Sequence, residues 1–256
     1  MNIIIKTKEE IEILREGGKR LATILKKVGE KIAPGISAYE LDQLAEKLIR
    51  DGGDEPAFLG YKPEGHGAPY PASLCVSVNS EVVHGIPFKD KILKEGDIVS
   101  IDLGLKHKGL FTDHAITLPV GKISKKDIEL LNVTKDSLLE GIVAIVPGSR
   151  VGDIGHAIEK FVKPYKYGIV RTLSGHGVGK YIHEDPYIPN FGKKGTGVLL
   201  EAGMVIAIEP MLTLGTHNVI VNKDGYTIRT SDDSKSAHFE HTVLITNDGA
   251  EILTES

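Results

Sequence analysis

The sequence predicts an α+β fold made of two similar halves related by a pseudo-twofold axis. Three observations support this fold class. Segments with helical spacing of apolar residues alternate with groups of strand-like segments, turn-forming dipeptides follow several strands, and a weak repeat relates the halves. Because no linker-like stretch divides the chain, we expect a single domain over residues 1–256, with half-repeats at about 8–123 and 124–254.

The first half begins with two helix-periodic segments, over residues 8–30 and after Pro34-Gly35. An irregular loop rich in Gly, Pro and Tyr follows at 53–73. The three strands expected next are 74–79, 97–104 and 110–118.

The second half has the same order, with two helices expected at about 124–146 and 151–163. The turn signals Asp224-Gly225 and Asp248-Gly249 then punctuate a group of strand-like segments. The strands expected there are 204–213, 218–222, 226–230 and 238–246.

Two pairs of segments carry the repeat. PGISAYELDQLAEKLI (34–49) aligns with PGSRVGDIGHAIEKFV (147–162), and KEGDIVSID (94–102) aligns with EAGMVIAIE (201–209). The offsets, 113 and 107 residues, are nearly equal, and each segment of the second pair ends in a carboxylate. A site between the halves would therefore take ligands from both.

The composition narrows the functional class. A net charge of −4 gives no sign of a nucleic-acid or anionic-membrane surface. The lone Cys75 cannot form an internal disulfide, which is typical of a reducing compartment. The apolar run near the start is too short for a signal peptide, and no run reaches membrane-spanning length. We therefore expect a cytoplasmic protein.

Acidic residues within apolar strands indicate the chemistry. If a hairpin is centred between His107 and Lys108, Asp102 and Asp113 are direct cross-strand neighbours, about 5 Å apart at Cβ. Two buried like charges need either a shared proton or a cation. Glu209 and Glu240 repeat the problem in the second half.

Four carboxylates and one imidazole fit two divalent cations better than one. Oxygen-rich ligation favours Mn, Fe or Co, with Zn as an alternative. Two such cations generate a hydroxide nucleophile near neutral pH and polarise a carbonyl, so the residues indicate a hydrolase.

The stretch LSGHGVGKYIHEDP (173–186) allows a phosphate loop, a pair of zinc ligands or a plain turn. Its glycines at alternate positions match no phosphate-binding fingerprint, and they disfavour a helix that would align the two histidines. With the carboxylates in place, His176 is predicted as the single nitrogen ligand. His183 is predicted as a donor near the reacting carbonyl.

Over about residues 6–254 the chain resembles the type I methionine aminopeptidases, in their short bacterial form. The order and spacing of the motifs agree with that family. The motifs are VVHGIP (82–87), DIVSIDLG (97–104), the later Asp113, SGHGVG (174–179), IHEDP (182–186), AIEPM (207–211) and FEHTVLIT (239–246).

The resemblance implies a pita-bread fold, a curved antiparallel sheet covered by helices, and removal of the N-terminal methionine from nascent proteins whose second residue is small. A hydroxide bridging two metals would attack the first peptide bond. Glu209 would also accept a proton, and His84 and His183 would contact the substrate. The metal ligands implied are Asp102, Asp113, His176, Glu209 and Glu240.

The resemblance also implies a methionine pocket. Its residues are Tyr61, Tyr70, Cys75 and Tyr226, with Phe58 and Ile182 where some members carry other side chains. The loop 60–71 is longer than usual, and its His66 lies near the place of a further pocket histidine in the family. Strand alternation should point His114 away from the metals. His238 shares a strand face with Glu240, which leaves a supporting role beside the metal ligands open, but we expect a surface position for it.

Two other functions stay open on this fold, an Xaa-Pro aminopeptidase and a non-catalytic binding protein. The expected partners are nascent polypeptide N-termini, with the ribosome near the exit tunnel as a candidate. We expect a monomer, with no nucleic-acid specificity and no membrane association.

Overall fold

The computed structural model describes residues 2–62 and 67–255, and its helices agree with the sequence prediction. The helices are α1 (Lys8–Gly29), α2 (Ala38–Asp51), α3 (Lys125–Val143) and α4 (Val151–Val162), with a 3-10 turn, η1 (Lys163–Tyr165), after α4. Capping boxes start α1 and α2: the hydroxyls of Thr7 and Ser37 accept hydrogen bonds from backbone amides at the third helical positions, where glutamates return the contact.

The strands of the first half are β1 (Glu55–Pro56), β2 (Leu74–Val78), β3 (Glu81–Val83), β4 (Ile98–His107) and β5 (Leu110–Pro119). Those of the second half are β6 (Gly168–Ile169), β7 (Gly175–Gly177), β8 (Glu184–Ile188), β9 (Val205–Ile208), β10 (Met211–Thr213), β11 (Val219–Val221), β12 (Ile228–Thr230), β13 (Ser236–His238), β14 (Glu240–Ile245) and β15 (Ala250–Ile252).

One antiparallel sheet runs through both halves, in the order β1-β4-β5-β14-β9-β7-β8. At its centre β5 pairs with β14, and β4 flanks β5 as β9 flanks β14. Two smaller three-stranded sheets, β13-β10-β6 and β11-β12-β3, complete the structure. The predicted α+β fold, with halves related by a pseudo-twofold axis, is confirmed.

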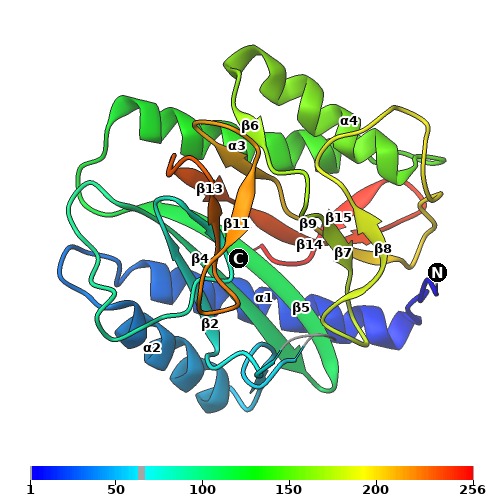
Figure 1. Ribbon diagram of the computed structural model, residues 1–256. Helices are drawn as coiled ribbons and strands as arrows, with labels where there is room; N and C mark the ends of the chain where they lie inside the picture. Colours follow the sequence, from blue (N-terminus) through cyan, green and yellow to red (C-terminus); the bar gives the residue numbers. More distant parts are fainter. Residues whose placement is uncertain (1, 63–66, 256) are drawn as a thin grey trace.

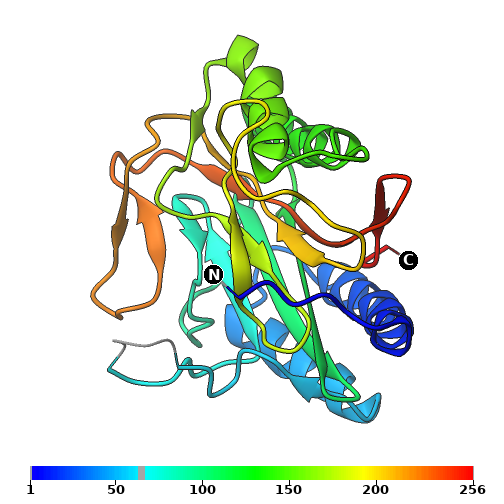
Figure 2. The ribbon, with the colours of Figure 1, turned by 90° about the vertical axis from the view of Figure 1, so that its right-hand side faces the viewer.

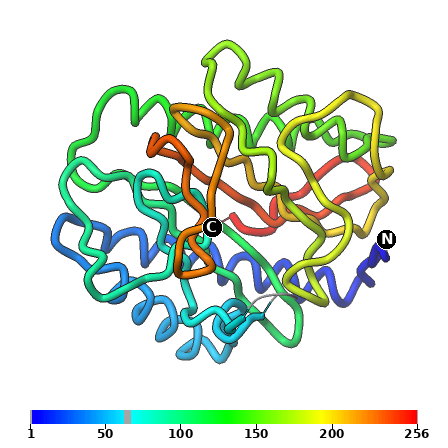
Figure 3. The backbone as a smooth tube through the Cα atoms, viewed as in Figure 1, coloured from blue at the N-terminus to red at the C-terminus, as the bar shows by residue number. Residues whose placement is uncertain are grey.

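The helices all cover one face of the sheet. Figure 1 shows α3 and α4 above its centre and α1 and α2 below it. In the view turned by 90° all four helices lie on the same side, and the orange β11–β12 hairpin stands on the other (Figure 2). One apolar core lies beneath each helix pair. None of these four helices covers the opposite face of the sheet, which can therefore hold a functional site (Figure 2). The backbone trace shows segments of both halves meeting on that face (Figure 3).

The predicted register of the β4–β5 hairpin is wrong. The centre of the turn lies one residue later than predicted, so Asp102 pairs with Ala115 and not with Asp113. His107 pairs with Leu110, so the turn consists of Lys108 and Gly109, both with positive φ (47° and 85°). A two-residue turn of this kind needs φ > 0 at both positions, and glycine adopts it readily. The chain therefore turns at Lys-Gly, later than predicted.

Two predicted strands, 204–213 and 238–246, are each interrupted in the structure. The first breaks after Ile208, because Pro210 has no amide hydrogen to continue a ladder. The second breaks at Phe239. At both breaks the chain passes between the large sheet and the β13-β10-β6 sheet, leaving the large sheet at the first break and entering it at the second. Glu209 and Glu240 lie at these crossings.

Candidate metal centre

Asp102 and Asp113 lie on one face of the β4–β5 hairpin. Asp102 pairs with Ala115 and Asp113 with Gly104, so the two aspartates are diagonal and not direct cross-strand neighbours. Both are buried. A Cβ atom at Gly104 would come within 2.7 Å of the Phe58 ring. Glycine at this position therefore allows the Phe58 ring to pack next to the strand, beside Asp113.

The second half brings its acidic residues to the same place across the sheet centre. Glu240, the first residue of β14, pairs with Ala115, the residue that also pairs with Asp102. The small alanine thus separates two carboxylates without filling the space above it. Glu209 follows β9, and His176 lies on the adjacent strand β7.

The side chains of both halves converge closely enough to share ions. Potential ligand atoms of Asp102, Asp113 and Glu240 lie within 4.8 Å of one another, and so do those of His176, Glu209 and Glu240. The His176 Nε2 atom lies 3.7 Å from Glu209 Oε1 and 4.0 Å from Asp113 Oδ2. The five predicted ligands are therefore in one cluster, and Glu240 belongs to both of these sets. Asp113 and His176 form a third such set with His183, the residue predicted as a substrate donor.

The electrostatics of this cluster fit divalent cations. Burial raises the pKa of Asp102 to about 6 and holds the pKa values of Asp113 and Glu240 well above their usual range. Within residues 2–62 and 67–255, no Lys or Arg forms an ion pair with these carboxylates, and Asp102 Oδ1 and Glu240 Oε1 have no hydrogen-bond partner. Buried charges of this kind are paired or coordinate metals.

The surroundings of His176 favour the neutral imidazole, the form that can act as a nitrogen ligand. Burial lowers the pKa of its imidazole to about 3. Its Nδ1 lies 2.9 Å from the carbonyl oxygen of Gly177, to which an Nδ1–H donates. That bond leaves the lone pair on Nε2, the nitrogen that faces the carboxylates.

Two further histidines border the cluster. His183 packs edge-on against His176, with ring centroids 4.5 Å apart, and its Nδ1 lies 2.7 Å from the Tyr61 hydroxyl. His84 has a left-handed backbone, with φ of 57°, which is uncommon for a residue other than glycine and is often associated with functional sites. Both line the cavity next to the carboxylates.

The cavity, of about 340 Å³, extends from the carboxylates between aromatic side chains. It is lined by the predicted pocket residues Tyr61, Tyr70, Cys75 and Tyr226, together with Phe58. Ile182 packs in the same apolar cluster but is not a lining residue. His66 lies outside the described residues. Val221 and Ile228, which were not predicted as pocket residues, also line the cavity. The Asp224-Gly225 turn signal between their strands could have indicated that they meet.

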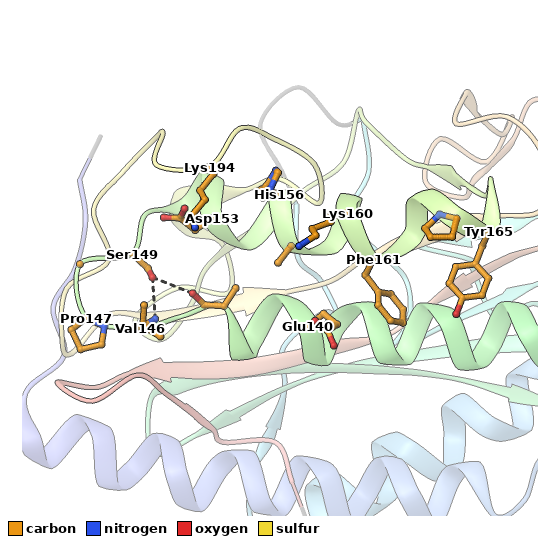
Figure 4. A pocket seen from close by; sticks show the side chains of 14 residues that line it. Glu140, Val146, Pro147, Ser149, Asp153, His156, Lys160, Phe161, Tyr165 and Lys194 are labelled. Atoms are coloured by element: carbon orange, nitrogen blue, oxygen red, sulfur yellow. Dashed lines mark hydrogen bonds between the residues drawn. The ribbon is translucent and has the colours of Figure 1, made fainter.

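A larger hollow, of about 740 Å³, lies between α3 and α4 (Figure 4). His156, Lys160 and Glu140 stand around it, above apolar side chains such as Phe161. In the described part of the chain none of its residues belongs to a group that could hold a metal. Size alone therefore does not identify the site, and the convergent carboxylates do.

Two histidines next to the ligands behave differently from each other. His114 points away from the carboxylates, as expected, and stacks on His241 at 4.7 Å between ring centroids. His238 was expected at the surface, and that prediction is wrong: it is 1% exposed, and its Nε2 lies 3.5 Å from Glu209 Oε2. Its burial follows from the pairing of β13 with β10, which the sequence pattern did not reveal.

The chain is similar to known proteins over nearly its full length. Residues 12–247 match the model of Metallopeptidase family M24. Methionine aminopeptidase of Aquifex aeolicus is 45% identical over all of both chains, and methionine aminopeptidase 1 of Bacillus subtilis is 46% identical over 98% of this chain and 99% of its own. The crystal structure of methionine aminopeptidase from Thermotoga maritima superposes with a TM-score of 0.94 at 46% identity, covering 100% of each chain. Prolidase from Pyrococcus furiosus is more distant, at 29% identity and a TM-score of 0.79, with 99% of this chain and 66% of that one covered.

Proposed function

Because the chain belongs to the metallopeptidase family M24 and, within it, to the methionine aminopeptidases, we propose that it removes the N-terminal methionine from nascent proteins whose second residue is small. One observation carries this proposal. Five potential ligands from both halves converge at the end of an apolar cavity of about 340 Å³. A cavity lined mainly by apolar and aromatic side chains, with a few convergent polar groups, is typical of small-molecule sites, and this one lies beside the proposed metal ligands. We further propose that residues 1–256 act as one catalytic domain, with half-repeats at about 8–123 and 124–254.

We propose Asp102, Asp113, His176, Glu209 and Glu240 as the ligands of two divalent cations, with Mn, Fe or Co favoured by the oxygen-rich set. Such ions would lower the pKa of a bound water and polarise the scissile carbonyl. Glu209 would then accept the proton of that water, and its position next to both the ligands and the cavity supports this role.

The neighbouring histidines would stabilise the substrate as its carbonyl becomes tetrahedral. His84 and His183 both reach the cavity, on the side of Leu173 and Glu209. If the Tyr61 hydroxyl donates to His183 Nδ1, the other nitrogen, Nε2, carries the hydrogen and can donate to the developing oxyanion.

Substituting Tyr61 by phenylalanine tests this arrangement. The ring that lines the cavity is kept, while the 2.7 Å contact with His183 is lost. A typical hydrogen bond contributes about 1 kcal/mol, so we expect kcat to fall roughly three- to tenfold with little change in KM. Steady-state kinetics on a Met-Gly peptide measure both constants. Tyr167→Phe, which loses a bond to Glu129 at the surface, is the matched control. An unchanged kcat in Tyr61→Phe would refute the role of the hydroxyl.

Substrate specificity follows from the cavity. One missing methylene in an apolar pocket typically costs about 1–3 kcal/mol, so norleucine should replace methionine, whereas the branch of leucine should clash. We expect cleavage of Met-Gly, Met-Ala and Met-Ser peptides, and almost none of Met-Lys and Met-Leu, because a large second side chain would crowd His84.

A panel of tetrapeptides that vary only at the first or second residue measures this specificity. The same assay with Ala-Pro peptides separates the Xaa-Pro alternative. Equal rates across the second-residue panel, or faster release of leucine than of methionine, would contradict the proposed specificity.

We propose nascent polypeptide N-termini as the partners of the site, met near the ribosomal exit tunnel by a monomer in the cytoplasm. An enzyme that acts on the N-termini of nascent chains would meet them where they leave the ribosome. The single free Cys75 supports a reducing compartment such as the cytoplasm. Among the described residues, no helix is long and apolar enough to cross a membrane.

A further inference from the structure

His238 is a buried imidazole that the proposed reaction does not use. It ends β13, pairs with Met211 of β10 and is 1% exposed. Neither of its ring nitrogens has a hydrogen-bond partner in the part of the chain that the structure describes. Burying an N–H without a partner is costly, so the position of this ring calls for a compensating interaction.

The backbone of His238 is held from the neighbouring sheet. The Thr117 hydroxyl of β5 accepts a hydrogen bond from the His238 amide (2.9 Å) and donates one to its carbonyl oxygen (2.7 Å). Ser100 of β4 lies 2.8 Å from the same hydroxyl. These buried contacts fix the direction in which the side chain leaves the strand.

That direction leads to the carboxylates. The His238 Nε2 atom lies 3.5 Å from Glu209 Oε2 and 4.0 Å from Glu240 Oε2. The first distance is only about 0.3 Å beyond the ordinary hydrogen-bond range. The other oxygen of Glu209, Oε1, faces His176 at 3.7 Å. The two oxygens of one carboxylate are thus directed at two different imidazoles.

We infer that His238 is a positioning residue for Glu209, donating Nε2–H to Oε2 so that Oε1 stays directed toward His176 and the reacting centre. This inference rests on the proposed function, in which Glu209 is both ligand and base. His238 belongs to none of the convergent ligand groups found within residues 2–62 and 67–255, so it lies beside the proposed ligands and not among them. Groups that orient metal ligands typically change metal affinity or activity 10–100-fold when removed.

Two substitutions separate orientation from simple packing. His238→Leu fills the site without a donor, and His238→Gln keeps an N–H at similar reach. In the Mn(II)-reconstituted protein we expect His238→Leu to lower kcat for Met-Gly-Met-Met about 10–100-fold with KM within about twofold. His238→Gln should stay within about fivefold of the wild type. His107→Gln, a buried histidine at the far end of the β4–β5 hairpin, is the control and should keep the wild-type kcat.

Isothermal titration of the metal-free variants with Mn(II) provides a readout independent of activity. His238→Leu should bind Mn(II) about tenfold more weakly with the stoichiometry of the wild type, and His238→Gln should bind as the wild type does. Wild-type kcat and affinity in His238→Leu would overturn the inference. Equal impairment of both variants, or loss of one Mn(II) equivalent in both, would also overturn it, because the imidazole would then act as a packing group or a ligand. If the wild type releases no methionine, the proposed function fails, and the Mn(II) titration still decides the role of His238.

Discussion

Glu209→Gln is expected to lower turnover at least about a hundredfold, the lower range for loss of a general base. The amide keeps the shape of the side chain but removes the proton acceptor and one negative charge among the proposed ligands. The position is sensitive because Glu209 lies between His176 and His238, 3.7 Å and 3.5 Å from their Nε2 atoms. Steady-state kinetics on Met-Gly-Met-Met measure kcat. Saturating Mn(II) keeps the metal sites filled, so that a weaker metal affinity of the variant does not lower the measured kcat.

The matched control for Glu209→Gln is His156→Gln. His156 lies on α4 beside the larger hollow, away from the carboxylates, and its substitution should leave kcat unchanged (Figure 4). Near-wild-type turnover in Glu209→Gln would show that the proton of the attacking water goes to another group.

Removal of divalent cations is expected to abolish activity, and Mn(II) or Co(II) should restore part of it. The same treatment should lower Tm, because a ligand that binds only the native state stabilises it. One ion at a hundred times its Kd contributes about 2.7 kcal/mol, which for a chain of this size corresponds to a Tm change on the order of 5–10 °C. Activity after dialysis against EDTA, metal content and thermal denaturation measure these effects. Full activity in excess EDTA, from protein without bound metal, would refute the two-metal proposal.

The stabilisation by metal should also increase with pH. In the metal-free fold, burial raises the pKa of Asp102 from 3.8 to about 6, and those of Asp113 and Glu240 are higher than usual as well. A carboxyl group with a raised pKa stabilises the fold below its ordinary pKa and loses that contribution as the pH rises through the folded value. The metal-free protein should therefore weaken from about pH 4 upward, while cations compensate the charges. The difference in Tm between the metal-bound and the metal-free protein should be larger near pH 7.5 than near pH 5. A smaller difference at pH 7.5 than at pH 5 would contradict this account.

The local structure followed from the sequence because its determinants are local. Helical spacing identifies α1 and α2, and acidic residues inside apolar strands identify Asp102 and Glu209 as residues that need compensation. The repeat with offsets of 113 and 107 residues predicted that both halves contribute to one site. These signals depend on residues close in sequence or on comparison of the chain with itself.

Contacts between distant segments were decided only by the tertiary structure. The register of β4 and β5 depends on the backbone angles of Lys108 and Gly109, which the alternation of side chains does not specify. The two-residue alternation of side chains along a strand determines which face of the sheet a residue occupies. It does not determine which neighbouring strand that residue contacts. His238 therefore looked like a surface residue until the pairing of β13 with β10 buried it beside Glu209. Sequence alone determined which groups needed a partner, and packing across the two sheets determined where those partners lie.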